Sequence, residues 1–144
     1  EVVSCQTCLT GEMFALLSEQ SVLRHGLAES WDDSAFDEGV AEGTARPERM
    51  LAQLFRLRAE GLIAGLAGAS AKARLSGLLI GAELASSKPW WLGMPILLVG
   101  SARLSTLYAR ALAAQGAGAQ NLSATDCTIA GLARASGALS KAAE

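Results

Sequence analysis

Residues 95–116, PILLVGSARLSTLYARALAAQG, place a short apolar run directly before a helical pattern. Four consecutive aliphatic residues, 96–99, have no polar alternation, which is typical of a strand buried on both faces of a parallel sheet. After the turn, apolar residues recur at helical spacing, namely Leu104, Leu107, Tyr108, Ala111 and Leu112. The stretch therefore predicts a strand, a tight turn and a helix, which is the repeating unit of α/β folds.

The turn itself consists of Gly100 and Ser101. Ser101 is placed to cap the helix, and Gly116 is placed to end it at the C′ position. Ligands of open α/β sheets bind where strands end at the carboxyl edge, so both turn residues are candidate binding residues. The turn matches neither the G-x-G-x-x-G fingerprint nor a P-loop. The local pattern alone therefore favours a plain strand–helix corner over a nucleotide site.

The remaining patterns predict the order β, several α, β, α, β, α, with too few strands for a complete sheet. We expect strands at 2–9, 96–99 and 120–123. The expected helices cover 12–23, 34–43, 47–62, 73–85 and 101–116, with a last helix from Asp126. Asp126 is the candidate N-cap of that helix, and Ile129 and Leu132 are expected to face inward.

The helix expected at 73–85 carries Gly77, Gly81 and Ala85 four residues apart. One face of this helix therefore has almost no side chains. Each glycine inside a helix lowers helix stability by up to about 1 kcal/mol relative to alanine. The repeated glycines therefore indicate a contact that requires them. A bare face lets another backbone or a flat ligand come close. Tight helix packing is the favoured interpretation, and contact with a ligand stays open.

Composition excludes several function classes. The 144 residues fit one globular domain. The net charge of −2 and the absence of a basic patch argue against nucleic acid as a partner. The most apolar stretch, 89–102, is too short to span a bilayer and contains two prolines, so no membrane contact is expected. There is no signal peptide pattern, and a chain that opens on Glu1 within a strand pattern indicates a cut from a longer protein.

Cys5 and Cys8 form a C-x-x-C pair within the expected strand 2–9. Residues three apart on a strand point to opposite faces, and zinc would need two further ligands, for which only Cys127 and His25 remain. We therefore expect neither a disulfide nor a metal site. Metal analysis that found one tightly bound zinc per chain would contradict this expectation.

Four blocks in order carry a wider resemblance: 10–27, 54–66, 74–85 and 97–116. They resemble the C-terminal half of the 2-dehydro-3-deoxygalactonokinase family, within the actin-like ATPase superfamily of sugar kinases. The resemblance covers nearly the whole chain. It implies a cytoplasmic enzyme of two ribonuclease-H-like lobes. ATP, with Mg²⁺, would bind between the lobes and phosphorylate the terminal hydroxyl of 2-dehydro-3-deoxygalactonate.

The resemblance also implies roles for particular residues. Gly100 and Ser101 would line the adenosine pocket, with Arg103 just inside the following helix, which reverses the local preference for a plain corner. Apart from the resemblance, Gly77 and Gly81 on the bare helix face are further candidate cofactor contacts. The residues facing phosphate or substrate would be Thr10, Gly11 and Glu12, and a role of Glu12 limited to the helix dipole stays open. Residues 127–135 resemble the superfamily's hinge helix, with Gly131 at its close-contact position.

The phosphate motifs of the family do not occur in these 144 residues. Residues 1–144 are therefore expected to be the C-terminal lobe, whose partners are the N-terminal lobe and the sugar acid. No residue stands out as the catalytic base, the isolated chain is expected to be inactive, and a homo-oligomer stays open. The alternative is a non-catalytic helical interaction module in which the glycine face is a partner groove. A thiol redox protein is a third and weaker interpretation.

Overall fold

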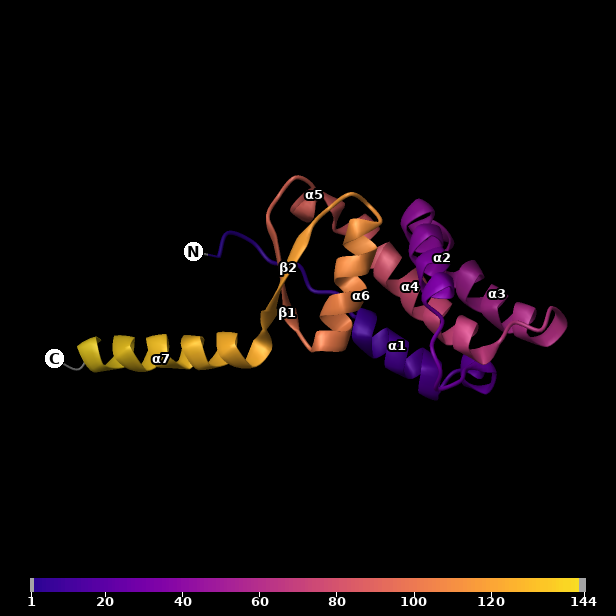
Figure 1. Ribbon diagram of the computed structural model, residues 1–144, viewed down its shortest axis with the longest axis horizontal. Coiled ribbons are helices and arrows are strands. Elements are labelled where there is room, and N and C mark those ends of the chain that lie inside the picture. The colour runs from indigo at the N-terminus through magenta and orange to yellow at the C-terminus, as the bar shows by residue number, and fades with distance from the viewer. Residues whose placement is uncertain (1, 143–144) are drawn as a thin grey trace. The chain divides into compact units, whose positions relative to one another are not determined.

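The computed structural model describes residues 2–142, which form two compact units. Unit 1 extends to Leu92 and unit 2 begins at Gly93. Unit 1 holds α1 (Thr10–Glu19), η1 (Val22–Gly26), α2 (Asp33–Ala45), η2 (Pro47–Arg49), α3 (Met50–Ile63), α4 (Gly68–Ser86) and α5 (Lys88–Trp91) (Figure 1). Unit 2 holds β1 (Ile96–Gly100), α6 (Ala102–Ala113), β2 (Ala119–Ser123) and α7 (Ala124–Ala142). The predicted α/β class is confirmed as a mostly helical chain with a small parallel sheet.

Helix α4 is the centre of unit 1. Eleven of its 19 residues are buried, because α1, α2 and α3 all pack against it. One cluster of the core consists of leucines from η1, α3 and α4, namely Leu23, Leu54, Leu57, Leu75, Leu78 and Leu79. None of the helices in residues 2–142 combines the length and hydrophobicity needed to cross a bilayer.

The bare face of α4 lies against α2. A Cβ at Gly77 would collide with the backbone oxygen of Phe36, and a Cβ at Gly81 would lie 2.5 Å from that of Val40. The contact is reciprocal, since Gly39 and Gly43 of α2 meet α4 backbone in the same way. Two glycine pairs at i, i+4 thus let two helix backbones touch. The structure favours the packing interpretation of this face and leaves no room there for a ligand.

Arg74 ties α4 to both neighbouring helices from a buried position. Its guanidinium donates to Glu42 of α2 at 2.5 Å and to Glu60 of α3 at 2.7 Å. Burial lowers the pKa of Arg74, but the hydrogen bond and charge of Glu42 and the charge of Glu60 outweigh it, so the pKa lies above its ordinary value. Arg74 is therefore a charged residue held in place by paired carboxylates.

Unit 2 is built around two parallel strands joined by α6. Ile96 pairs with Ala119 and Gly100 with Ser123, so the carboxyl ends of both strands meet at one edge. Ala111 and Leu112 of α6 are buried. The expectation that β1 is buried on both faces is wrong, because Leu97 and Val99 are 58% and 54% exposed. Within the described residues, one face of β1 lacks a covering layer.

Residues 2–9 do not form the expected strand, and their side chains are exposed. A strand requires a hydrogen-bonded neighbour, and the sheet of the described residues contains only β1 and β2. The strand argument about Cys5 and Cys8 therefore fails. Both thiols are free and exposed, like that of Cys127, and the prediction of no zinc and no disulfide remains for metal analysis to test.

Several helix ends also differ from the sequence predictions. Helix α1 ends at Glu19, short of the expected residue 23, and η1 follows. Helix α7 begins at Ala124, and the side chain of Ser123 accepts the N–H of Asp126, so Ser123 takes the role expected of Asp126. Ile129 and Leu132 are 61% and 66% exposed and do not face inward. Gly116 has the expected positive φ of 77°, but two residues beyond the C-cap.

Asp32 links the starts of α2 and α4. Its carboxylate accepts the backbone N–H groups of Ser34 and Ala35 as an N-cap, and also the hydroxyl of Ser70 at 2.6 Å. The bond from Ser70 is the largest cause, followed by that from the Ser34 hydroxyl, of a pKa lowered from 3.8 to about 2. The charged form of Asp32 is thus the one that holds these helix starts together.

We expect Asp32→Asn to reduce the acid sensitivity of unit 1. A carboxyl whose folded pKa is depressed stabilises the fold above its unfolded value, and this contribution is lost as pH falls from about 4 through 2. Asparagine keeps the N-cap but does not titrate. Urea unfolding at several pH values should show a smaller loss of stability between pH 5 and pH 2 in the variant. Equal losses in both proteins would contradict the assignment.

Candidate functional site

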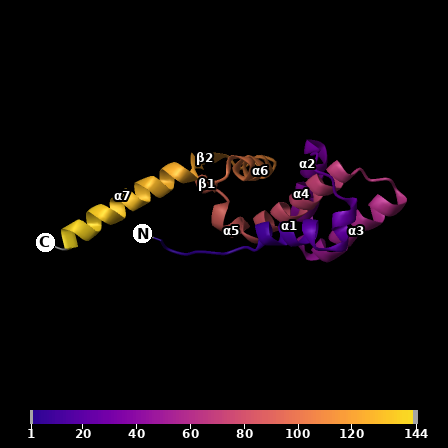
Figure 2. The same cartoon turned by 90° about the horizontal axis from the view of Figure 1, so that it is seen from below.

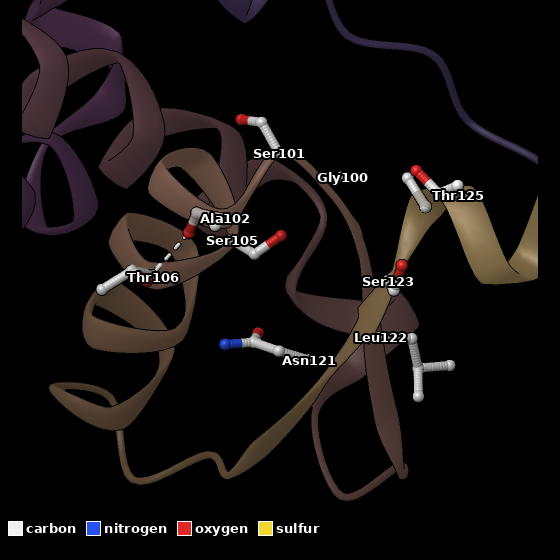
Figure 3. Close-up of a pocket in the computed structure, with 10 residues that line it drawn as sticks. Gly100, Ser101, Ala102, Ser105, Thr106, Asn121, Leu122, Ser123 and Thr125 are labelled. Atoms are coloured by element: carbon white, nitrogen blue, oxygen red, sulfur yellow. Dashed lines mark hydrogen bonds between the residues drawn. The ribbon is translucent and has the colours of Figure 1, made fainter.

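A cavity of about 530 Å³ opens in unit 2 at the carboxyl edge of the two strands. Both strand ends and both following helix starts contribute to its wall (Figure 3). The lining residues are Gly100, Ser101, Ala102, Ser105, Thr106, Asn121, Leu122, Ser123, Ala124 and Thr125. The cavity therefore lies where α/β sheets bind their ligands.

Gly100 leaves the strand end open toward this cavity. A Cβ built on Gly100 would meet only the Oγ of Ser105, at 3.5 Å, which is an ordinary van der Waals contact. The backbone of Gly100 is not in the positive-φ region, where only Gly65, Gly93 and Gly116 lie among the described residues. Neither packing nor backbone geometry therefore requires glycine at this position. A ligand close to the backbone would require it.

Ser101 and Ser123 organise the two helix starts. The Oγ of Ser101 accepts the N–H of Leu104 at 3.4 Å and thereby caps α6, as predicted. The Oγ of Ser123 accepts the N–H of Asp126 at 3.2 Å at the start of α7. The first turns of both helices have N–H groups without intrahelical partners, so the edge has a partial positive charge.

Ser105 and Asn121 are among the polar lining side chains that make no hydrogen bond with other described residues. Ser105 on α6 is 7% exposed, and neither its hydroxyl nor the amide of Asn121 on β2 is paired. Figure 3 shows both side chains directed into the space between α6 and β2, whereas Leu122 points to the opposite side. The cavity thus offers a hydroxyl and an amide, each able to donate and to accept, to a ligand.

Of the sequence-predicted cofactor residues, the structure brings Gly100 and Ser101 to this cavity. Arg103 lies in the first turn of α6 but does not line the cavity. Gly77 and Gly81 belong to unit 1, where α2 covers them. Gly77 and Gly81 therefore line no cavity in which the expected cofactor contacts could form.

Thr10, Gly11 and Glu12 form the first turn of α1 in unit 1. No side chain caps this helix start, and a Cβ at Gly11 would have no atom within 4 Å. The N–H groups of this turn are therefore open to a ligand. Within the described residues, no group of three or more histidine, cysteine or carboxylate side chains could hold a metal.

Sequence reasoning missed Ser105, Asn121, Ser123 and Thr125. Asn121 and Ser123 could be placed only with the parallel register, which sets Ser123 beside Gly100. One signal was present, because Ser123 and Asp126 have the S-x-x-D spacing of a helix start. Ser105 was part of the expected helix, four residues after the cap, but its direction depends on where β2 lies.

Comparison with known proteins decides the family. The family model described as 2-keto-3-deoxy-galactonokinase matches residues 1–135. The chain belongs to this family. A relative from Rhizobium meliloti (strain 1021), "Probable 2-dehydro-3-deoxygalactonokinase DgoK1", is 36% identical over 138 residues. The alignment covers 92% of this chain and 45% of the relative.

Two further members of the family extend the comparison. The 2-dehydro-3-deoxygalactonokinase of Escherichia coli (strain K12) is 35% identical over 113 residues, which are 77% of this chain and 38% of the relative. A crystal structure from Sinorhizobium meliloti, whose name refers to 2-dehydro-3-deoxygalactonokinase, superposes with a TM-score of 0.84 at 35% identity. The superposition covers 90% of this chain and 45% of the chain in that crystal structure. The chain therefore spans less than half the length of these relatives.

Proposed function

We propose that this chain supplies the adenosine-binding lobe of a carbohydrate kinase that uses ATP and Mg²⁺ to phosphorylate 2-dehydro-3-deoxygalactonate to its 6-phosphate. The observation that carries the proposal is the cavity at the β1–β2 edge, where an open Gly100 lies beside the unpaired Ser105 and Asn121. The lobe would have a ribonuclease-H-like sheet, of which β1 and β2 are part. Its partner would be an N-terminal lobe.

The residues at the cavity suit an adenosine. Asparagine can donate to and accept from the edge of adenine at the same time. The Ser105 hydroxyl can bond to either a ribose hydroxyl or a ring nitrogen. Gly100 has no Cβ, so a flat base or a ribose can approach its backbone closely. These contacts bind and orient the nucleoside and leave its phosphates to other groups.

ATP would supply the phosphoryl group, and Mg²⁺ would neutralise its developing charge. The uncapped start of α1 at Thr10 and Gly11 would bind a phosphate or the carboxylate of the sugar acid through its N–H groups. Glu12 would not bind an anion and would instead orient a magnesium-bound water or a substrate hydroxyl. The family membership and the open helix start support these proposed roles.

The alternative of a helical interaction module loses its main support in the structure. That hypothesis required the glycine face of α4 to be a groove for a partner. Gly77 and Gly81 are in backbone contact with α2 of the same chain, so no groove exists there. The cavity that supports the nucleotide-binding proposal is present in unit 2. No observation favours the interaction module over nucleotide binding.

In the complete enzyme, we expect Asn121→Leu to raise the KM for ATP about tenfold, because a hydrogen-bonded ligand group would lose its partner. The KM for the sugar acid should change less than about twofold. Gln120→Leu is the matched control, since Gln120 is exposed on the same strand and does not line the cavity. Steady-state kinetics with each substrate varied in turn measures both constants. An unchanged KM for ATP in Asn121→Leu would contradict the assignment of this cavity to adenosine.

A further inference from the structure

A cavity of about 380 Å³ lies in unit 1 between the end of α2 and the first turns of α3. Both helices pack on α4, which fixes the walls of this cavity (Figures 1 and 2). Three arginines line it, and the other lining residues are uncharged except for one glutamate. The lining consists of Arg46, Arg49, Arg56, Glu42, Ala45, Ala52 and Gln53. These arginines form no continuous basic run in the sequence, so the fold gathers them around one space.

The local backbone sets the three guanidinium groups on one side. Pro47 disfavours helical backbone at Arg46, which has a φ of −144° and a ψ of 66° and ends α2. In the 3-10 turn that follows, the N–H of Arg49 donates to the carbonyl of Arg46 at 3.0 Å, so these two side chains at i and i+3 share a side. Arg56 lies two helical turns after Arg49, on the same face of α3. Glu48 of the same turn does not line the cavity.

Gln53 connects the two walls and has one unpaired atom. Its Nε2 donates to the backbone oxygen of Glu42 at 3.3 Å and thereby holds α3 against the last turn of α2. Its Oε1 is buried and has no hydrogen-bond partner among the described residues. Buried polar atoms nearly always have a partner. An unpaired oxygen at a cavity wall therefore indicates a donor that a water molecule or a ligand supplies.

The positive charge of the cavity is only partly compensated. Glu42 already accepts a hydrogen bond from Arg74 of α4 at 2.5 Å, so its charge is largely balanced from the side of α4. Arg56 is paired within α3. The guanidinium groups of Arg46 and Arg49 form no ion pair or hydrogen bond with other described residues. Two cations thus have all their donors available at this cavity.

Three guanidinium groups around one space suit a phosphate group. Each guanidinium can donate two parallel hydrogen bonds to an anion. A carboxylate has two oxygen atoms and needs one such partner, whereas a phosphate monoester has three oxygen atoms that accept strong hydrogen bonds. The volume lies in the range of small-molecule sites. It therefore leaves room for a carbon chain, and a hydroxyl on that chain can donate to Gln53.

We propose that unit 1 binds a small phosphorylated polyhydroxy compound in this cavity. The guanidinium groups of Arg46, Arg49 and Arg56 hold the phosphate, and a hydroxyl of the ligand donates to the Oε1 of Gln53. The cavity belongs to unit 1 and the proposed nucleotide cavity to unit 2, so this proposal does not depend on the proposed function.

The first test is binding of glycerol 3-phosphate to the complete protein, measured by isothermal titration calorimetry. We expect Arg49→Gln to raise the dissociation constant about tenfold or more, because charge-assisted hydrogen bonds are lost. Arg58→Gln is the matched control, since it removes the same charge from α3 at a residue that does not line the cavity. This control should change the constant less than about twofold, because solvent and salt screen a charge outside the cavity.

Thermal unfolding without ligand checks that all three proteins are folded. A parent protein that does not bind glycerol 3-phosphate would overturn the proposal. Binding that Arg49→Gln leaves unchanged would place the ester elsewhere in the protein and would also overturn it. Equal weakening by Arg49→Gln and Arg58→Gln would indicate a general effect of charge rather than a site, with the same consequence.

Inorganic phosphate distinguishes a phosphate ester from the free ion. Phosphate has no carbon chain to fill the remaining volume or to carry a hydroxyl to Gln53, so it should bind more weakly than glycerol 3-phosphate. Binding of inorganic phosphate as tight as that of the ester would contradict the assignment to a phosphorylated polyhydroxy compound.

A crystal structure of the complete protein with glycerol 3-phosphate locates the phosphate group. Its oxygen atoms should lie within about 3.2 Å of guanidinium nitrogens from at least two of Arg46, Arg49 and Arg56. An ester bound at another place, or a cavity filled by side chains from the rest of the complete protein, would overturn the proposal.

Discussion

Replacing Gly77 by valine is expected to lower the free energy of unfolding of unit 1 by about 3 kcal/mol or more. A Cβ at this position would collide with the backbone oxygen of Phe36 and lie 2.8 Å from the backbone nitrogen of Val40. Neither atom can move without shifting the whole of α2, because both belong to helix backbone. The two helices would have to separate, and the bonds from Arg74 to Glu42 and Glu60 would lengthen with them.

Gly61→Val is the matched control for Gly77→Val. Gly61 lies inside α3, and a Cβ there would have no atom within 4 Å. Valine has a higher helix propensity than glycine, so this variant should be as stable as the parent protein or slightly more stable. Urea unfolding followed by circular dichroism compares the two. If Gly77→Val unfolded at the same urea concentration as Gly61→Val, the backbone contact between α2 and α4 would be wrong.

Replacing Gly100 by valine in the complete enzyme is expected to raise the KM for ATP roughly 5- to 150-fold, equivalent to about 1–3 kcal/mol of lost binding. The nearest atom to a Cβ at Gly100 is the Ser105 Oγ at 3.5 Å, so the side chain would point into the cavity rather than into the fold. The branched side chain would then occupy the space proposed for the nucleoside. The KM for the sugar acid should stay within about twofold, because the fold itself tolerates the change.

Gly118→Val controls for a general effect on unit 2. Gly118 precedes β2 and does not line the cavity, and a Cβ at this position would have no atom within 4 Å. This variant should leave both KM values unchanged. If Gly100→Val reduced only the yield of folded enzyme and left the KM for ATP normal, Gly100 would be no more than the corner of a strand and a helix.

The sequence predicted those features of unit 2 that depend on near neighbours. The apolar run at 96–99, the cap at Ser101 and the stripe of α6 are all local patterns, and each lies within a residue or two of its expected place. The expected order of strand, helix, strand and helix followed from the same periodicities. For Gly100 and Ser101, the position at the edge of the sheet therefore followed from the order of residues along the chain.

Features that depend on distant partners were not predictable in the same way. Residues 2–9 have strand-like composition but no neighbour in the described sheet, so they form no strand and stay exposed. The bare face of α4 suggested two kinds of contact, and only the position of Gly39 and Gly43 on α2 decided between them. Asn121 entered the candidate site through the register of β2 against β1, which no local pattern encodes.

The central claim is that adenosine binds in the cavity at the carboxyl edge of β1 and β2. A crystal structure of the complete enzyme with Mg²⁺ and a non-hydrolysable ATP analogue tests it most directly. We predict that the adenosine lies against the backbone of Gly100, with the Ser105 hydroxyl or the Asn121 amide within about 3.2 Å of a base or ribose atom. An analogue bound elsewhere, with only solvent between α6 and β2, would contradict the claim.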